Sequence, residues 1–150
     1  MLAGDATAIP KQRLGGVEAV RVLHLTRRAA IKAKTQASNQ IRDLIVTAPD
    51  DIRDELRGLT TTARIRRCAR WRPGDPLDAR SATRVALRQL AHRWLSLDAE
   101  AKQLERQMRT LLEQLVPSLL AELGVSTNTA AQLVLAAGEP GTPLVDVLPL

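Results

Sequence analysis

Residues 87–115 read LRQLAHRWLSLDAEAKQLERQMRTLLEQL, and this stretch decides the fold. Apolar residues recur along it at alternating steps of three and four, a pattern typical of a heptad seam between packed helices. The seam positions are Leu87, Leu90, Trp94, Leu97, Ala101, Leu104, Met108, Leu111 and Leu115. Burying each large side chain contributes roughly 1.5 kcal/mol or more. The sequence therefore predicts one long helix whose apolar side is covered by another helix.

The nearest partner for this seam is a second long helix, predicted from Val17 to about Ala48. Its own seam repeats with the same period, at Val20, Leu23, Ala30, Ala37, Ile41, Leu44 and Ala48. Arg27 and Lys34 fall at core-type positions of that seam, where polar residues cost stability and often fix register or oligomeric state. We expect an antiparallel coiled-coil pair about 45 Å long. A second copy of the chain would complete it as a homodimer, through Leu87, Leu90, Trp94, Leu97, Leu104, Met108, Leu111 and Leu115.

Shorter helices are expected between the two long ones. Pro49 ends the first long helix and opens a short one, whose early acids suit the positive end of the helix dipole. A third helix is predicted from about Thr61 to Trp71. The turn RPGDPLD, residues 72–78, follows it, and Asp78 or Ser81 can cap the next helix.

The last predicted structure is a helical hairpin that turns at residues 124–126, with Ser126 or Thr127 as the cap of its second helix. It is similar to a helix-hairpin-helix that grips phosphate, and equally to a plain capped hairpin. The expected fold class is all-α: a long antiparallel coiled-coil helix pair with short intervening helices and this hairpin. The expected division is an N-terminal strap (1–16), a helical coiled-coil region (17–116), the hairpin (117–138) and a disordered tail (139–150).

Composition removes several function classes. The chain has no Phe or Tyr and only two Trp, so packing must rely on aliphatic side chains, and base stacking by aromatic residues is disfavoured. A single cysteine, Cys68, rules out an internal disulfide and fits a structural thiol better than a nucleophile. The two histidines lack companion ligands at metal spacing, so we expect no metal and no cofactor. Short apolar runs and the lack of a signal peptide favour a soluble, cytoplasmic protein with no membrane or small-molecule partner.

Positive charge is concentrated in one segment. Between Lys11 and Arg42 there are eight basic residues and one acid, seven net positive charges against +6 for the whole chain. At about 100° per residue, part of this segment forms a polar stripe opposite the apolar seam. The stripe holds Arg21, Arg28, Lys32, Thr35, Gln36 and Asn39. Such a face can donate to the phosphates of DNA or RNA, contacts that position a strand without reading its sequence. A solvated helix face remains the alternative.

The candidate nucleic-acid-binding residues come from two helices. On the long basic helix they are Arg21, Arg27, Arg28, Lys32, Lys34 and Arg42. On the helix after Thr61 they are Arg64, Arg66 and Arg67. Each would act as a charge-assisted donor to phosphate oxygens.

The strings VEAVRVLHLTRRAAIKAKTQASNQIRDLIVTAPDDIRDELRGL (17–59) and LGVSTNTAAQLVLAAG (123–138) carry a family resemblance. With the Arg-rich helix between them, they resemble the middle region of DEDD-type insertion-sequence transposases of the IS-one-ten family, related to Piv invertases. The resemblance covers roughly residues 2–138 and is most specific over 21–59. It implies a DNA transposition and recombination protein that uses magnesium and guide RNA. Residues 117–138 would then match the start of its C-terminal transposase domain.

The same resemblance implies that both catalytic centres lie outside this chain. The family's four acidic metal ligands precede the residues matching 2–11, and its catalytic serine follows those matching 129–138. No serine here (Ser81, Ser96, Ser118, Ser126) matches a catalytic position, so no catalytic residue is assigned. We expect a truncated, transposase-like, nucleic-acid-binding and dimerising helical module. The alternative is a coiled-coil module that binds protein and has no nucleic-acid role.

Overall fold

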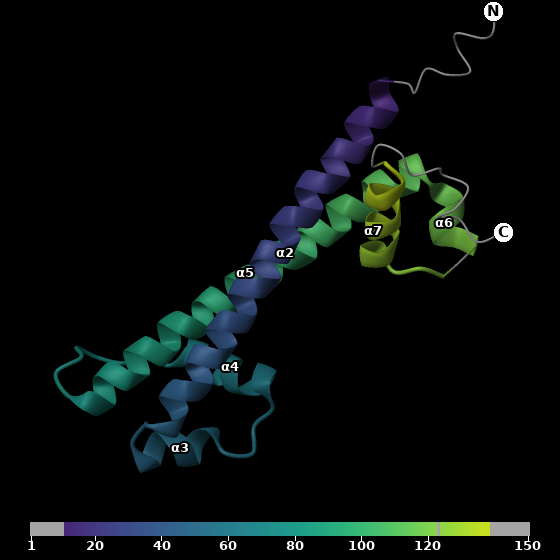
Figure 1. Cartoon of the computed structure of the whole chain (residues 1–150). Coiled ribbons are helices and arrows are strands. Elements are labelled where there is room, and N and C mark those ends of the chain that lie inside the picture. The colour runs from purple at the N-terminus through teal and green to yellow at the C-terminus, as the bar shows by residue number, and fades with distance from the viewer. Residues whose placement is uncertain (1–10, 123, 139–150) are drawn as a thin grey trace, which may run out of the picture. The chain divides into compact units, whose positions relative to one another are not determined.

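The computed structural model describes residues 11–122 and 124–138, and every regular element within them is an α-helix. The helices are α2 (Lys11–Val46), α3 (Asp50–Leu56), α4 (Thr61–Arg70), α5 (Ala79–Leu115), α6 (Pro117–Glu122) and α7 (Thr127–Ala137) (Figure 1). The predicted fold class is confirmed: two long helices are joined through short ones and followed by a helical hairpin.

The predicted N-terminal strap needs a correction at its end. α2 begins at Lys11, so residues 11–16 are helical, although the two glycines at 15 and 16 disfavour a helix interior. Val20, one turn further along α2, is fully buried, and its packing outweighs the low helix propensity of the glycines. The rest of the strap, residues 1–10, and the predicted tail, residues 139–150, lie outside the described residues.

The helix boundaries follow the capping chemistry of the sequence. Asp78 accepts a hydrogen bond from the backbone N–H of Ser81 at 2.7 Å, and Ser126 accepts one from Thr129 at 3.2 Å. Thr60 does the same for Ala63 at the start of α4. Each oxygen satisfies one of the backbone donors that a helix start leaves unpaired. Of the two caps offered for each site, Asp78 and Ser126 are the ones used.

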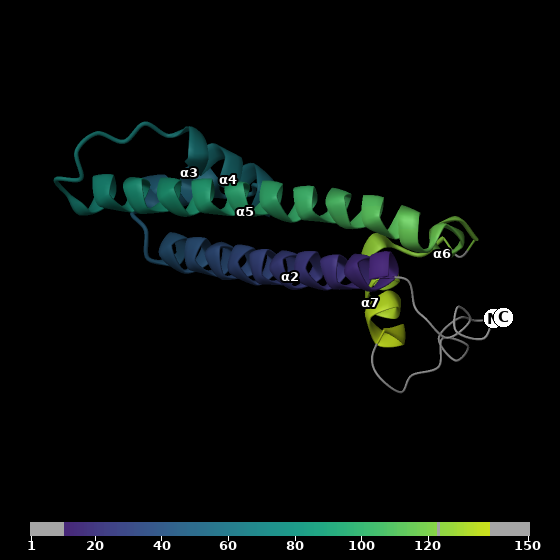
Figure 2. The ribbon, with the colours of Figure 1, turned by 90° about the horizontal axis from the view of Figure 1, so that it is seen from above.

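The chain divides into two compact units, each containing part of both long helices. The terminal unit contains residues 11–28, 102–122 and 124–138 of the described chain, and the central unit contains residues 29–101. Within each unit α2 and α5 run side by side in opposite directions, as both views show (Figure 1, Figure 2). The predicted coiled-coil region 17–116 is therefore shared between two units.

Each unit has its own core. In the terminal unit the buried residues are Val20, Met108, Leu112, Leu119, Ala130, Ala131 and Val134, from α2, α5, α6 and α7. In the central unit they are Ile41, Ala48, Ile52, Leu56, Ile65, Cys68, Trp71, Leu87 and Ala91. Both cores therefore combine α2 and α5 with shorter elements: α3 and α4 in the central unit, and α6 and α7 in the terminal unit.

The buried side of α5 differs in register from the predicted seam. Leu87, Ala101 and Met108 are buried as expected, but the alternate positions fall one residue later, at Ala91 and Leu112. The predicted alternates Leu90, Leu97, Leu104 and Leu111 are only half-buried. Trp94 and Leu115 are also half-buried. Two of the observed alternate positions, 98 and 105, carry the acids Asp98 and Glu105 in place of apolar residues. Both acids form ion pairs with α2, which are described below.

Candidate nucleic-acid interface

Two of the predicted binding residues are engaged inside the fold. In the terminal unit, Arg27 lies 3.6 Å from Glu105 of α5 and donates to the Asn128 side chain of α7 at 3.3 Å. Its side chain is only 16% exposed. The Arg27 guanidinium joins α2, α5 and α7, so we leave this residue out of the nucleic-acid interface.

Lys34 is held in a similar way in the central unit. Its Nζ lies 3.0 Å from Asp98 Oδ1 and 5.0 Å from the centroid of the Trp94 ring. Both charged side chains are a quarter exposed or less. The ammonium is therefore neutralised by a carboxylate and covered by an aromatic face, and Lys34 also leaves the candidate set.

The two pairs have matching spacings. Arg27 and Lys34 are seven residues apart on α2, and their partners Glu105 and Asp98 are seven residues apart on α5. Seven residues is one heptad, so these pairs occupy equivalent seam positions of an antiparallel helix pair. These acids lie one residue after Leu97 and Leu104, so the most buried side of α5 cannot be found from its leucines alone.

Two basic residues of α2 present their charges to solvent. Arg28, in the terminal unit, and Lys32, in the central unit, are both exposed. Neither makes a hydrogen bond or an ion pair within the described part of the chain. Arg28 does interact electrostatically with His24, one turn earlier, but carries no acid partner. Among the α2 cations from residue 15 onward, whose side chains are described, these two are the most available to a polyanion.

Arg21 and Arg42 are intermediate cases. Arg21 lies 3.2 Å from Glu18 on the same helix and is 42% exposed, an ion pair that water and salt weaken. Arg42 is exposed and donates to the neutral amide of Asn39 at 3.2 Å. Both guanidiniums keep donors that could turn toward a phosphate.

His24 is a buried polar residue beneath these cations. Only 5% of it is exposed, and its Nδ1 has no hydrogen-bond partner among the described residues. Burial, together with the positive charges of Arg28 and Arg27, lowers the pKa of His24 below the ordinary 6.5. The imidazole is therefore neutral near pH 7 and adds no charge to the basic face.

The three predicted binding residues on α4 also differ in how far they are engaged inside the fold. Arg64 is half-buried and donates to the backbone carbonyl of Leu59 at 3.3 Å. Arg67 lies 3.6 Å from Glu55. Arg66 alone of the three is exposed with no hydrogen bond or ion pair to any described residue. Arg66 is therefore the one candidate that we keep on this helix.

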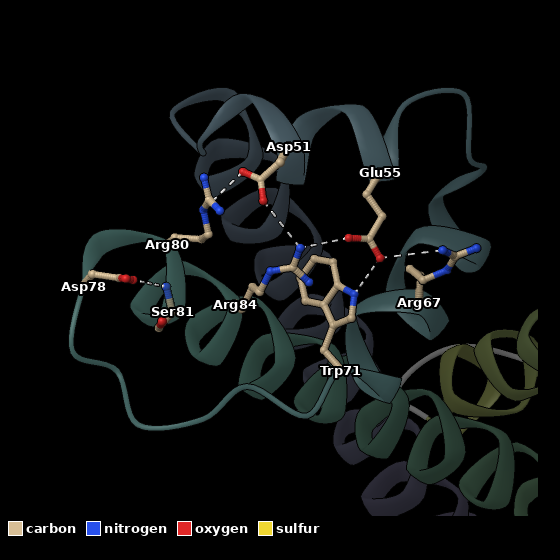
Figure 3. A network of polar contacts seen from close by, with 8 residues as sticks. All are labelled: Asp51, Glu55, Arg67, Trp71, Asp78, Arg80, Ser81 and Arg84. Atoms are coloured by element: carbon tan, nitrogen blue, oxygen red, sulfur yellow. Dashed lines mark hydrogen bonds and ion pairs between the residues drawn. The ribbon is translucent and has the colours of Figure 1, made fainter.

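Glu55 is the centre of a polar network that sequence reasoning missed (Figure 3). Its carboxylate accepts from Trp71 Nε1 at 2.9 Å and from Arg84 at 3.1 Å. Partial burial opposes the charge of Glu55, but the Trp71 hydrogen bond and the guanidiniums of Arg84 and Arg67 outweigh it, so the pKa of Glu55 is lowered. The carboxylate stays ionised and ties α3 to α4 and α5.

Asp51, one turn before Glu55 on α3, extends this network. It lies 3.5 Å from Arg80 and 3.7 Å from Arg84, whose guanidinium also stacks 4.7 Å from the Trp71 ring centroid (Figure 3). The signal in the sequence was the matching spacing: Asp51 and Glu55 are four apart, and so are Arg80 and Arg84. The acids of α3 thus do more than favour a helix start, since they also neutralise arginines of α5.

Other chemistries find little support in the described residues. No group of three or more potential metal ligands occurs within 11–122 and 124–138. Cys68 is fully buried, and burial together with the charge of Glu55 raises its pKa to about 11, which fits the predicted structural thiol. Among these same residues, none of the helices is long and apolar enough to cross a bilayer.

Comparison with known proteins leaves the family open. No family model, no curated protein and no solved structure matches this chain significantly.

Proposed function

We propose that this chain is a nucleic-acid-binding helical module that contacts phosphates through the solvent-facing cations of α2. The observation that supports it is the sorting of charge on that helix. Arg27 and Lys34 are engaged by acids of α5, whereas Arg28 and Lys32 are exposed and have no acid partner in the described chain. Exposed, unpaired cations release counterions from a phosphate backbone at little desolvation cost.

The wider setting of this proposal comes from the sequence resemblance. In a DEDD-type transposase, a module of this kind would hold guide RNA or DNA while other domains perform the chemistry. Arg21, Arg42 and Arg66 would add weaker contacts, because the first two already have a local partner and the third lies on a different helix. Contacts of this type position a strand without selecting its sequence.

The test is the salt dependence of binding to a fluorescent duplex DNA and to a single-stranded RNA. Two or three phosphate contacts predict a slope of about −2 to −3 in a plot of log K against log salt for the duplex. The double variant R28Q/K32Q should lose about two units of that slope. The control R53Q/R57Q removes two exposed arginines that are paired with acids on α3, and should change the slope little. Equal losses in both variants would mean that only net charge matters.

A second candidate function is supported by a different observation on α5. Leu90, Leu97, Leu104 and Leu111 recur every seven residues beside the packed seam, and all four are only partly buried. Such a row suits the packing of a further helix, either from a second copy or from another protein. Sedimentation velocity on the same sample distinguishes the readings. An oligomer that ignores both nucleic acids at low salt would favour the protein-binding function.

A further inference from the structure

A basic cavity lies in the central unit, away from the stripe on α2. It has a volume of about 530 Å³ and lies where the segment after α4 meets α5. Its lining residues are Arg72, Pro73, Val85, Arg88 and Gln89. No acid is among them, whereas Arg67, Arg80 and Arg84 on the adjoining helices each have a carboxylate partner.

Arg88 is the half-buried basic residue of this cavity. Its side chain makes no hydrogen bond or ion pair with any described residue, and its Nε is covered by the protein. A guanidinium without a carboxylate partner can form charge-assisted hydrogen bonds with the oxygens of an anion that enters the cavity.

The other lining residues narrow the chemistry of that group. Arg72 adds a second guanidinium, which is exposed and has no ion pair in the described chain. Gln89 adds a neutral amide. Two guanidinium groups and an amide donor suit an anion with several oxygens better than a single carboxylate. Pro73 and Val85 supply the apolar part of the lining.

We propose that this cavity binds a phosphate group, with Arg88 and Arg72 as its two charged donors. The molecule that carries this phosphate rests on the proposed function. If the chain binds nucleic acid, the phosphate is part of a DNA or RNA strand. If it does not, the phosphate is a free anion. Both sources share the same oxygen chemistry, so the experiment below separates them.

The first part of the test uses inorganic phosphate and the ¹⁵N-labelled full chain. The Arg88 Nε–H resonance should shift and saturate on titration with phosphate, and should not do so with chloride at equal ionic strength. R72Q, a change on an exposed loop that leaves the helices intact, should weaken this binding about tenfold, the effect of losing one charged hydrogen bond. R88K keeps the positive charge but lacks the planar guanidinium, and should also weaken phosphate binding. R106Q, an exposed arginine outside the cavity, should bind like the wild type.

The second part measures duplex DNA binding with the same variants. If the phosphate belongs to a strand, R72Q should reduce the salt slope by about 0.9, one contact, while R106Q leaves it unchanged. Loss of phosphate binding in R72Q with an unaltered slope supports the site and assigns it to a free anion. A wild-type chain that binds no nucleic acid defeats the proposed function, while the phosphate titration still decides the cavity. No saturable shift, or equal phosphate affinity in R72Q and the wild type, overturns the inference.

Discussion

At the scale of single residues, most of the informative chemistry concerns where a charge is placed. Arg27 and Arg28 are neighbours in sequence, yet one is mostly buried against Glu105 and the other faces water. Helical geometry turns successive residues by about 100°, so adjacent cations can serve the core and the surface respectively. Composition cannot distinguish these roles, because both residues are arginines.

His24 provides a pH-dependent prediction at this scale. Its pKa is lowered in the folded chain, so between the unfolded value of 6.5 and the folded value the unfolded state binds more protons. The free energy of unfolding should therefore be fully maintained above about pH 6.5 and fall as the pH drops through the range between the two values. Urea unfolding at a series of pH values from 7.5 to 5 would measure this.

The control for that experiment is H24L, which replaces the imidazole with an apolar side chain of similar volume that cannot titrate. Its free energy of unfolding should vary less over the same pH range. If H24L and the wild type lose the same stability between pH 7 and 5, the burial of a neutral imidazole is not the cause.

At the scale of elements, the pairing of α2 with α5 depends on charges placed in an apolar seam. Removing Asp98 from the Lys34–Asp98 pair leaves the Lys34 ammonium part-buried over Trp94 without that carboxylate. D98L should cost on the order of 2 kcal/mol, and adding K34M should restore half or more of it, because an apolar pair of similar size can replace a buried ion pair. Thermal unfolding of both variants would measure the difference.

The matched control is Glu113, whose ion pair with Arg109 is more than half exposed on α5. E113Q should cost less than about 0.5 kcal/mol. A D98L/K34M chain less stable than D98L would show that the seam needs the lysine itself.

The end of α3 offers a backbone prediction. Gly58 has a φ of +75°, and an added Cβ would meet nothing within 4 Å, so the effect of a side chain there comes from the backbone alone. G58A should destabilise the chain by about 1 kcal/mol, since a left-handed conformation disfavours any Cβ. G74A is the control, as Gly74 has equal space and no left-handed φ. Equal urea midpoints for the two variants would contradict this role for Gly58.

At the scale of the whole molecule, helical pattern and punctuation could be predicted from the sequence. Pro49, Asp78 and Ser126 mark helix starts by local chemistry that needs no tertiary contact. The register of α5 could not be found by seeking apolar residues, because Asp98 and Glu105 occupy seam positions. Their shared spacing with Arg27 and Lys34 was the available signal, and it requires reading both helices together.

Only part of the candidate site could be predicted from the sequence. Position on a helix identified the solvent-facing cations Arg28 and Lys32 correctly as exposed residues. It could not show that Arg27, Lys34 and Arg67 have acid partners, because those partners lie on other helices. The basic cavity at Arg88 also depends on a tertiary contact, because it forms where the segment after α4 lies against α5.

The central claim is that α2 divides its cations between the seam and a partner's phosphates. The most direct measurement compares the salt slope of duplex DNA binding in two double variants, R28Q/K32Q and K34M/D98L. The account predicts that the first loses about two units of slope, while the second, which leaves net charge unchanged, keeps the wild-type slope. A wild-type slope in R28Q/K32Q, or a reduced one in a folded K34M/D98L chain, would contradict it.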